Sequence, residues 1–309
     1  MKATIAALMT LALSPASLPA QTPAGRGSVQ ALLSDPAKPI VVVAHRGCHN
    51  AAPGHGLGQA PENSLAALEH CVTLGVEMME TDIQRSLDGH LVIMHDERVD
   101  RTTNGHGLVS EMTLEQLRQL KLRQNLGGYD QPLTDQRVLT LEELLAAAKG
   151  RITLNLDVKA PIYVEVIDAV MRAGAADLVT VKARAGIASP AIAALPPYDR
   201  VPFIAILDHG GDPATLGAVA ERQVSGAHPV AFELPRMPAA AVAGVQTVAA
   251  RHGVALFVNT LGDGYLAGLG GDNDSDPELI WGKAHRAGVT FFQTDRPETL
   301  LTFRATLKR

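Results

Sequence analysis

Two histidines stand directly after apolar runs, where side chains able to do chemistry are easiest to recognise. His45 follows Val41–Ala44, and His95 follows Leu91–Met94. An imidazole titrates near neutral pH, so one histidine can remove a proton while a second delivers one. We therefore take His45 and His95 as a candidate acid–base pair. His49 lies in a loop that could rim the same site, and we expect it to be a solvated loop residue.

Three carboxylates form a second constellation. Glu80 and Asp82 are two residues apart on a predicted strand and so point to the same face, and Asp157 and Lys159 repeat this spacing on a neighbouring strand. Carboxylates held this close repel one another, which favours one divalent cation with oxygen ligands, Ca²⁺ or Mg²⁺, over zinc. The alternative is a structural ion network that pairs these acids with Arg85, Arg151 or Lys159. Spacing alone leaves both interpretations open.

Two cations stand beside these groups. Arg46 follows His45, and Lys159 lies two residues after Asp157, so both could bind a phosphate or could simply neutralise the acids. Glu62 lies in Pro61-Glu-Asn-Ser64, which opens a predicted helix whose first amides favour an anion. Its carboxylate could contact Arg46 or serve only as an acid in the first helical turn.

The side chains named so far must be brought together by the strands that they follow. Short β-branched runs alternate with helical stretches from residue 40 onward, which indicates repeated βα units and a parallel sheet. The expected strands are Ile40–Ala44, Val76–Ile83, Ile152–Asp157, Leu178–Val181, Val201–Leu207, Val230–Leu234, Val254–Val258 and Val289–Gln293. This pattern favours an α/β fold of the closed (β/α)8 barrel type over an open doubly wound sheet. Such a barrel carries its reactive groups at the carboxyl ends of the strands.

Helix starts and one long interval complete this plan. Ser189, Asp212 and Asp276 each precede a proline and predict helix starts. Thr113 with Gln116, and Thr140 with Glu143, fit capping boxes. The interval between strands two and three is longer than a βα unit needs, and we expect a small insertion at about residues 97–137 rather than a second domain.

The amino terminus has the pattern of a targeting segment. Residues 1–20 hold one lysine, an apolar run and a stretch of small residues, which predicts a signal peptide and an exported, periplasmic or secreted protein. Residues 21–37 are expected to be a mobile leader outside the fold, and residues 38–309 to form the barrel. No later run of about 18 apolar residues suggests a membrane span.

Composition narrows the remaining possibilities. The net charge of −5 comes without a basic stripe, and aromatic residues make up 4% of the chain, so a nucleic-acid partner is not expected. Cys48 lies in a loop and Cys71 near the end of a predicted helix that starts about Pro61. Ten helical residues rise about 15 Å, beyond the reach of a disulfide, so free thiols are expected.

Several motifs taken in order resemble the glycerophosphodiester phosphodiesterase family, within the phosphatidylinositol phospholipase C-like barrel phosphodiesterases. They are His45-Arg-Gly47, Pro61-Glu-Asn-Ser64, Glu80-Thr-Asp82, Asp88-Gly89, His95-Asp96, Arg101-Thr-Thr-Asn-Gly105 and Thr294-Asp-Arg-Pro297. The resemblance covers residues 40 to 300. It implies metal-dependent hydrolysis of small-molecule glycerophosphodiesters to glycerol 3-phosphate and an alcohol, and a role in lipid metabolism.

The resemblance also implies residue roles, with two departures. His45 and His95 match the acid–base histidines of the family. Glu80 and Asp82 match metal ligands, and Asp157 stands where the third ligand is usually a glutamate. Arg46, Lys159 and Asn259 match substrate-binding positions, and Glu62, at the start of the predicted helix, is taken as a fourth substrate-binding candidate. The loop Cys48–Ala60 is longer than in compact members, and the tryptophan often found just before the family asparagine is absent.

Two alternatives belong to other functional classes. A lipid-directed phosphodiesterase, of phospholipase C or lysophospholipase D type, would share this chemistry, but no basic amphipathic helix supports it. A non-catalytic phosphate-binding protein could share the scaffold, although binding alone does not need a paired proton donor and acceptor. The sequence does not fix the alcohol, the choice of cation or the number of subunits.

Overall fold

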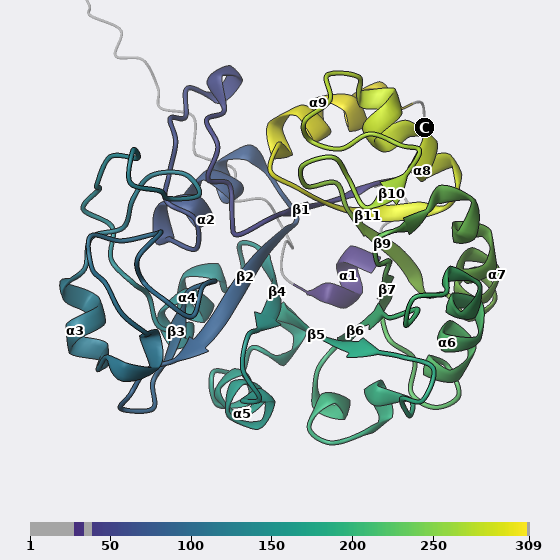
Figure 1. Cartoon of the computed structure of the whole chain (residues 1–309), viewed down its shortest axis with the longest axis horizontal. Helices are drawn as coiled ribbons and strands as arrows, with labels where there is room; N and C mark the ends of the chain where they lie inside the picture. Colours follow the sequence, from purple (N-terminus) through teal and green to yellow (C-terminus); the bar gives the residue numbers. More distant parts are fainter. Residues whose placement is uncertain (1–27, 34–38, 308–309) are drawn as a thin grey trace, which may run out of the picture.

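The computed structural model describes residues 28–33 and 39–307. The predicted signal peptide, residues 1–20, and most of the predicted leader, residues 21–37, lie outside these ranges. Parallel strands form a closed ring at the centre of the molecule, and helices surround it (Figure 1). In ring order the strands are β1 (Val41–Ala44), β2 (Met78–Arg85), β4 (Thr153–Val158), β5 (Val179–Ala185), β6 (Phe203–Leu207), β7 (Ala231–Glu233), β9 (Ala255–Asn259) and β11 (Val289–Thr294).

The ring closes because β1 pairs with both β11 and β2. Val41 lies opposite Phe291, and Val43 lies opposite Met78. Each of the expected strands is present, and the (β/α)8 barrel is therefore confirmed. Nearly every strand residue is buried, as a sheet covered on its outer face by helices and filled inside by side chains requires.

Helices pack against the outside of the ring (Figure 1). They are α2 (Leu65–Leu74), α4 (Leu141–Ala148), α5 (Tyr163–Arg172), α6 (Leu216–Gln223), α7 (Val242–His252), α8 (Lys283–Arg286) and α9 (Pro297–Thr306). The capping box at Thr140 and Glu143 starts α4, as predicted. Asp212 caps a 3₁₀ turn before α6, and Asp276 accepts the amide hydrogen of Glu278.

The segment between β5 and β6 differs from the prediction of a helix at Ser189-Pro190. Two short 3₁₀ turns, Ile192–Ala194 and Tyr198–Arg200, occupy this position instead of an α-helix. Pro196 and Pro197 lie between these turns and have no amide hydrogen to donate, so a continuous helix cannot form there.

The long interval between β2 and β4 folds on the side of the barrel. It contains β3 (Leu91–Ile93), antiparallel to β2, a 3₁₀ turn at Val109–Glu111, and α3 (Leu114–Gln119). The predicted capping box of Thr113 and Gln116 starts α3. A small apolar cluster of its own holds this segment together; it consists of Val92, Met94, Val99, Val109, Leu117, Leu122 and Val138.

Part of the predicted leader belongs to the fold, which corrects that prediction. Residues 29–33 form helix α1 (Val29–Leu33), which lies in the centre of the ring in Figure 1. Leu32 packs against Val41, Met78 and other interior residues at the amino ends of the strands. An open barrel end exposes apolar side chains to water, and covering them with Leu32 is favourable.

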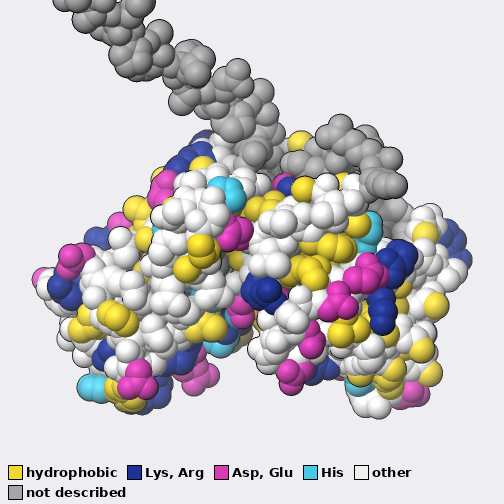
Figure 2. Space-filling model, turned by 90° about the horizontal axis from the view of Figure 1, so that it is seen from above, with side chains coloured by type: hydrophobic (Ala, Val, Ile, Leu, Met, Phe, Trp, Pro, Cys, Tyr) yellow, Lys and Arg dark blue, Asp and Glu magenta, His cyan; other side chains and the backbone are white. Residues whose placement is uncertain are grey.

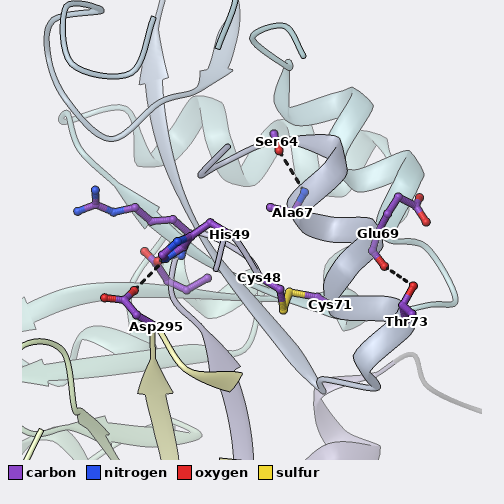
Figure 3. The surroundings of a disulfide bond; sticks show 10 residues. Cys48, His49, Ser64, Ala67, Glu69, Cys71, Thr73 and Asp295 are labelled. Carbon is purple, nitrogen blue, oxygen red and sulfur yellow. Dashed lines mark hydrogen bonds and ion pairs between the residues drawn. A yellow bond between two sulfur atoms is a disulfide. The ribbon is translucent and has the colours of Figure 1, made fainter. Parts of the chain in front are cut away.

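The two cysteines form a disulfide, so the expectation of free thiols is wrong (Figure 3). The amide of Cys48 donates to the carbonyl oxygen of Ala67, which shows that the loop after β1 runs back along α2 to its middle. Only about one turn of helix then separates this point from Cys71. The two Cα atoms are 5.1 Å apart.

Two further features concern the surface. On the face shown in Figure 2, acidic and basic side chains are interspersed rather than gathered into one basic stripe. Within residues 28–33 and 39–307, no helix is long and apolar enough to cross a bilayer. A two-stranded sheet of β8 (Met237–Pro238) and β10 (Leu266–Ala267) joins the loops that follow β7 and β9.

Candidate active site

A cavity of about 930 Å³ opens at the carboxyl ends of the barrel strands. The predicted site residues that line it are His45, Arg46, Glu80, Asp82, His95, Asp157, Lys159 and Asn259. Glu62, the remaining predicted residue, is buried behind Arg46 and does not line the cavity. The carboxyl ends of the barrel strands therefore bring together side chains that lie up to about two hundred positions apart in the sequence.

The three predicted carboxylates meet on β2 and β4. Asp82 is directly opposite Asp157 in the strand register, and Glu80 shares its inward face. One oxygen of each carboxylate lies within 4.8 Å of the others, so the group could hold a metal ion. Glu80 and Asp82 are each about 1% exposed, so water cannot screen their repulsion.

The charges of these acids are strongly coupled. Burial, together with the charge of Asp82, raises the pKa of Glu80 to about 8. Burial opposes ionisation of Asp82 as well, but the nearby charges of Lys159, His95 and Arg46 keep its pKa below the usual value. One member of the pair thus tends to keep a proton when no cation is present.

Hydrogen bonds orient the carboxylates and leave one oxygen poorly satisfied. The amide of Arg46 donates to Glu80 Oε2 at 2.9 Å, and Asn63 Nδ2 donates to Asp82 Oδ2 at 2.8 Å. Asp82 Oδ1 accepts no well-aligned hydrogen bond, although Lys159 Nζ lies 2.9 Å away. A buried set of carboxylates with an unsatisfied oxygen fits a hard divalent cation.

Two lysines also contact the acids. Lys159 Nζ lies 2.8 Å from Asp157 Oδ2, and Lys182 Nζ lies 3.3 Å from the same oxygen and 3.4 Å from Glu233 Oε2. The structural ion network therefore exists in part, whereas Arg85 and Arg151 pair elsewhere, with Glu165 and Glu69. Arg46 Nε also lies 3.6 Å from Asp82 Oδ2. The four carboxylates of Glu80, Asp82, Asp157 and Glu233 still outnumber these three cations, of which Arg46 is shared with Glu62, so the cluster carries excess negative charge that a bound cation would neutralise.

The sequence prediction missed Lys182 and Glu233. Lys182 interrupts the apolar run of β5, and Glu233 ends β7. Both are nearly fully buried. The rule that found Glu80 and Asp157, a charged residue at the end of an apolar strand, would have found them too.

Each candidate histidine is held by a carboxylate. His45 Nδ1 lies 2.7 Å from Asp295 Oδ1, and His95 Nδ1 lies 2.7 Å from Asp96 Oδ1. A carboxylate on Nδ1 favours the tautomer in which Nε2 is free to exchange a proton. Burial lowers the pKa of His45, and the contact with Asp295 opposes this effect without cancelling it.

The loop after β1 adds a second histidine to this arrangement. His49 Nε2 lies 3.0 Å from Asp295 Oδ1, and His49 Nδ1 lies 2.6 Å from Asn125 Oδ1. Figure 3 shows the contact between His49 and Asp295. His49 is 1% exposed, so the expectation of a solvated loop residue is wrong. The disulfide at the preceding residue holds this loop against α2, which explains the burial.

A chain of ion pairs connects the two sides of the site. Arg46 Nη1 lies 3.2 Å from both oxygens of Glu62, and Arg101 contacts Glu62 at 2.7 Å and Asp96 at 2.8 Å. Glu62 thus links Arg46 to the carboxylate that holds His95. Arg46 has a φ of 53°, a conformation that side chains other than glycine rarely adopt, and such residues cluster at functional sites.

Buried acceptors form the opposite part of the cavity wall. Asn259 Nδ2 donates to Glu233 Oε1 at 2.9 Å, which leaves Asn259 Oδ1 without a partner. Gln293 Oε1 is also buried and unpartnered. These oxygens can accept hydrogen bonds from hydroxyl or amino groups of a ligand.

Fold and site together define a barrel phosphodiesterase-like protein, and comparisons with known proteins agree. Residues 45–192 match the glycerophosphoryl diester phosphodiesterase family. This match over 148 of the 309 residues confirms the resemblance seen in the sequence.

Individual relatives match over a limited length. The chain is 36% identical over 123 residues to the glycerophosphodiester phosphodiesterase of Caldanaerobacter subterraneus, covering 40% of this chain and 46% of the relative. It is 37% identical over 121 residues to human glycerophosphodiester phosphodiesterase 1, covering 39% and 34%. The matched part thus covers about half of the first relative and about a third of the second.

Solved structures resemble the whole barrel. A glycerophosphoryl diester phosphodiesterase from Parabacteroides distasonis superposes with a TM-score of 0.68 at 22% identity, over 92% of this chain and 93% of the other. A phosphodiesterase from Oleispira antarctica, in complex with the product sn-glycerol-3-phosphate, superposes with a TM-score of 0.57 at 20% identity, over 85% and 95%. At this identity the likeness supports the fold alone.

Proposed function

We propose that the protein hydrolyses glycerophosphodiesters to glycerol 3-phosphate and an alcohol, with a divalent cation and a pair of histidines. The observation that carries this proposal is the cavity that gathers His45 and His95, each held by a carboxylate, beside three acids and Arg46. The family match over residues 45–192 and the names of the matched relatives support it.

Glu80, Asp82 and Asp157 would hold the cation, either Ca²⁺ or Mg²⁺. When bound, such a cation supplies positive charge that neutralises a phosphate oxygen and lowers the pKa of a coordinated hydroxyl group. Asp157 is shorter than a glutamate, and Lys159 and Lys182 already share one of its oxygens. Its second oxygen is the one that remains for a ligand bond.

The side chains of the cavity would carry the proton transfers. Arg46 and Lys159 would bind the phosphate oxygens and stabilise the charge that develops there. One histidine would accept the proton of a neighbouring substrate hydroxyl as its oxygen attacks phosphorus, and the other would protonate the departing alcohol oxygen. This first step would leave a cyclic phosphate on the glycerol. Water would then open the ring, with the roles of the two histidines reversed.

The direct test replaces each histidine by alanine. We expect His45→Ala and His95→Ala to lose most turnover of glycerophosphocholine in the presence of Ca²⁺ or Mg²⁺. His228→Ala is the matched control, because this exposed histidine precedes β7 at the opposite end of the barrel. Turnover close to that of the unaltered protein in either site variant would contradict the assignment.

The cation is tested separately by binding. Titration calorimetry of the chelator-treated protein should show one site for Ca²⁺ or Mg²⁺, and Glu80→Gln should remove it while Asp177→Asn should not. Asp177 is an exposed acid before β5, at the amino end of the strand. An unchanged rate after exhaustive chelation would make the carboxylates a purely structural cluster.

We also propose export of the protein. The composition of residues 1–20 supports a signal peptide, and a disulfide suits an oxidising compartment. Cell fractionation with amino-terminal sequencing of the mature protein tests this. Recovery of the full-length chain in the cytoplasmic fraction alone would refute it.

A further inference from the structure

Two arginines at the mouth of the cavity differ from its other cations. Arg46, Lys159 and Lys182 each lie within ion-pairing distance of a carboxylate, whereas Arg184 and Arg236 line the same cavity and, within residues 28–33 and 39–307, form no ion pair. Both are exposed to solvent. They are therefore positive charges without a protein counterion.

The strand register places these arginines on one wall. Arg184 lies two residues after Lys182 on β5 and so shares its inward side, one step nearer the mouth. Arg184 is opposite Ile206 of β6, which is opposite Glu233 of β7. Arg236 follows Glu233 by three residues, in the loop above it.

Arg236 is held in place before any ligand binds. Its guanidinium carbon lies 4.3 Å from the centre of the Tyr265 ring, and its Nη1 donates to the carbonyl oxygen of Gly264 at 3.1 Å. His209 Nε2 lies 3.1 Å from the carbonyl oxygen of Arg236, and the pairing of β8 with β10 fixes the two loops together. An ordered guanidinium loses less entropy when it binds an anion than a mobile one does.

One acid lies on the same wall but does not neutralise the arginines. Asp208 lines the cavity, and its Oδ1 accepts the amide hydrogen of Gly210 at 2.9 Å. Within the described residues, neither arginine forms an ion pair with this carboxylate. Glu233, the next acid, is already shared by Lys182 and Asn259.

We propose that Arg184 and Arg236 form a second anion subsite, which favours glycerophosphodiesters whose alcohol carries a negative charge of its own. This inference rests on the proposed function of the same cavity. Since Arg46, His45 and His95 gather where β1, β2 and β3 end, a phosphodiester held there would extend its alcohol toward the loops after β5 and β7. A carboxylate or a phosphate on that alcohol would meet two unpaired guanidinium groups, which bind such anions through paired hydrogen bonds.

The test uses substrates that differ by one charged group. Glycerophosphoserine differs from glycerophosphoethanolamine by a single carboxylate, and both release glycerol 3-phosphate, so one assay reports both rates. We expect a higher kcat/KM for the serine ester, and a roughly fivefold smaller preference in Arg184→Gln and in Arg236→Gln, the order expected of one partly exposed charge pair. The change should appear in KM rather than in kcat, and the preference should weaken as salt is added.

Control variants separate the subsite from general effects of charge or folding. Arg172→Gln removes an exposed arginine of α5 that forms no ion pair among the described residues, and it should keep the preference of the unaltered protein. Arg236→Lys keeps the charge but loses the planar guanidinium, and an intermediate preference is expected. Thermal unfolding of each variant checks that it is folded.

A second substrate pair distinguishes the two sources of negative charge. Glycerophosphoglycerol and its analogue with a terminal phosphate differ by that phosphate alone, so the larger preference identifies the favoured anion. Equal kcat/KM within both pairs, or an unchanged preference in both Gln variants, would overturn the subsite. Absence of activity on all four esters would instead refute the proposed function.

Discussion

Replacing Asp295 by asparagine probes the environment of His45 most directly. Asp295 contacts Nδ1 of His45 at 2.7 Å, and its side chain is 19% exposed, so water contributes little to the pair. Asparagine has nearly the same shape but carries no charge. It also accepts hydrogen bonds through only one of its two terminal atoms.

The size of the effect follows from the contact that is lost. A hydrogen bond to a charged group contributes about 1.5–3 kcal/mol, which corresponds to a roughly 10- to 150-fold fall in kcat/KM. The pH dependence should change as well. Burial lowers the pKa of His45 while the hydrogen bond and charge of Asp295 raise it, so removal of the carboxylate lets the pKa fall further.

The assay is the pH profile of kcat/KM for glycerophosphocholine. If His45 is the base, it must be neutral and the acidic limb moves to lower pH; if it is the acid, the alkaline limb moves to lower pH instead. The limb that moves therefore assigns the role of His45. Asp177→Asn, far from the cavity, should leave both limbs in place. A folded Asp295→Asn protein with an unmoved profile and a rate within about twofold would refute this reasoning.

Three further predictions concern stability. Burial raises the pKa of Asp272 to about 6, so between about pH 4 and 6 the folded protein keeps a proton that the unfolded chain releases. The resulting stabilisation is complete below about pH 4 and is lost as the pH rises through 6. In urea unfolding at several pH values, the free energy of unfolding relative to Asp272→Asn should fall by at most about 3 kcal/mol across this window, and a constant difference would contradict it. Reduction of the Cys48–Cys71 disulfide, whose cysteines are 23 positions apart, should cost about 3 kcal/mol of stability, seen as a lower melting temperature that a Cys48→Ala, Cys71→Ala double variant reproduces without reductant. Thr140→Ala removes the cap of α4 and should cost about 1 kcal/mol in the same unfolding assay, whereas Thr140→Ser should cost much less.

The barrel and most of the site were predictable because both follow from local patterns. Apolar runs predicted every strand of the barrel, since a strand buried on both faces must be apolar nearly throughout. His45, Glu80 and Asp157 stood out because they interrupt or end such runs. Lys182 followed the same rule and was missed because the expected strand, Leu178–Val181, ended just before it, whereas β5 continues to Ala185.

Features that depend on where a loop or terminal segment packs against the barrel were not predictable from the sequence. Cys71 does lie near the end of its helix, but the helix begins at Leu65 rather than at about Pro61. The distance argument also assumed that the loop after β1 stays at the start of the helix. The same return buries His49, which no periodicity could indicate. Likewise, nothing in the sequence around Leu32 shows that it covers a barrel end formed by residues far along the chain.

The proposed reaction and the proposed alcohol subsite draw largely on different halves of the barrel, which has a consequence for how substrate preference can evolve. The proposed acid–base histidines and the candidate cation ligands come from β1 to β4 and the loops beside them, and the region that matches the family, residues 45–192, ends before β6. Arg236 and Tyr265 belong to the later half, in loops that β8 and β10 join into one piece. Exchange of that piece between related barrels would transfer the Arg236 half of the proposed subsite, and a host with an arginine at the position of Arg184 would gain the preference while its strands β1 to β4 stay unchanged.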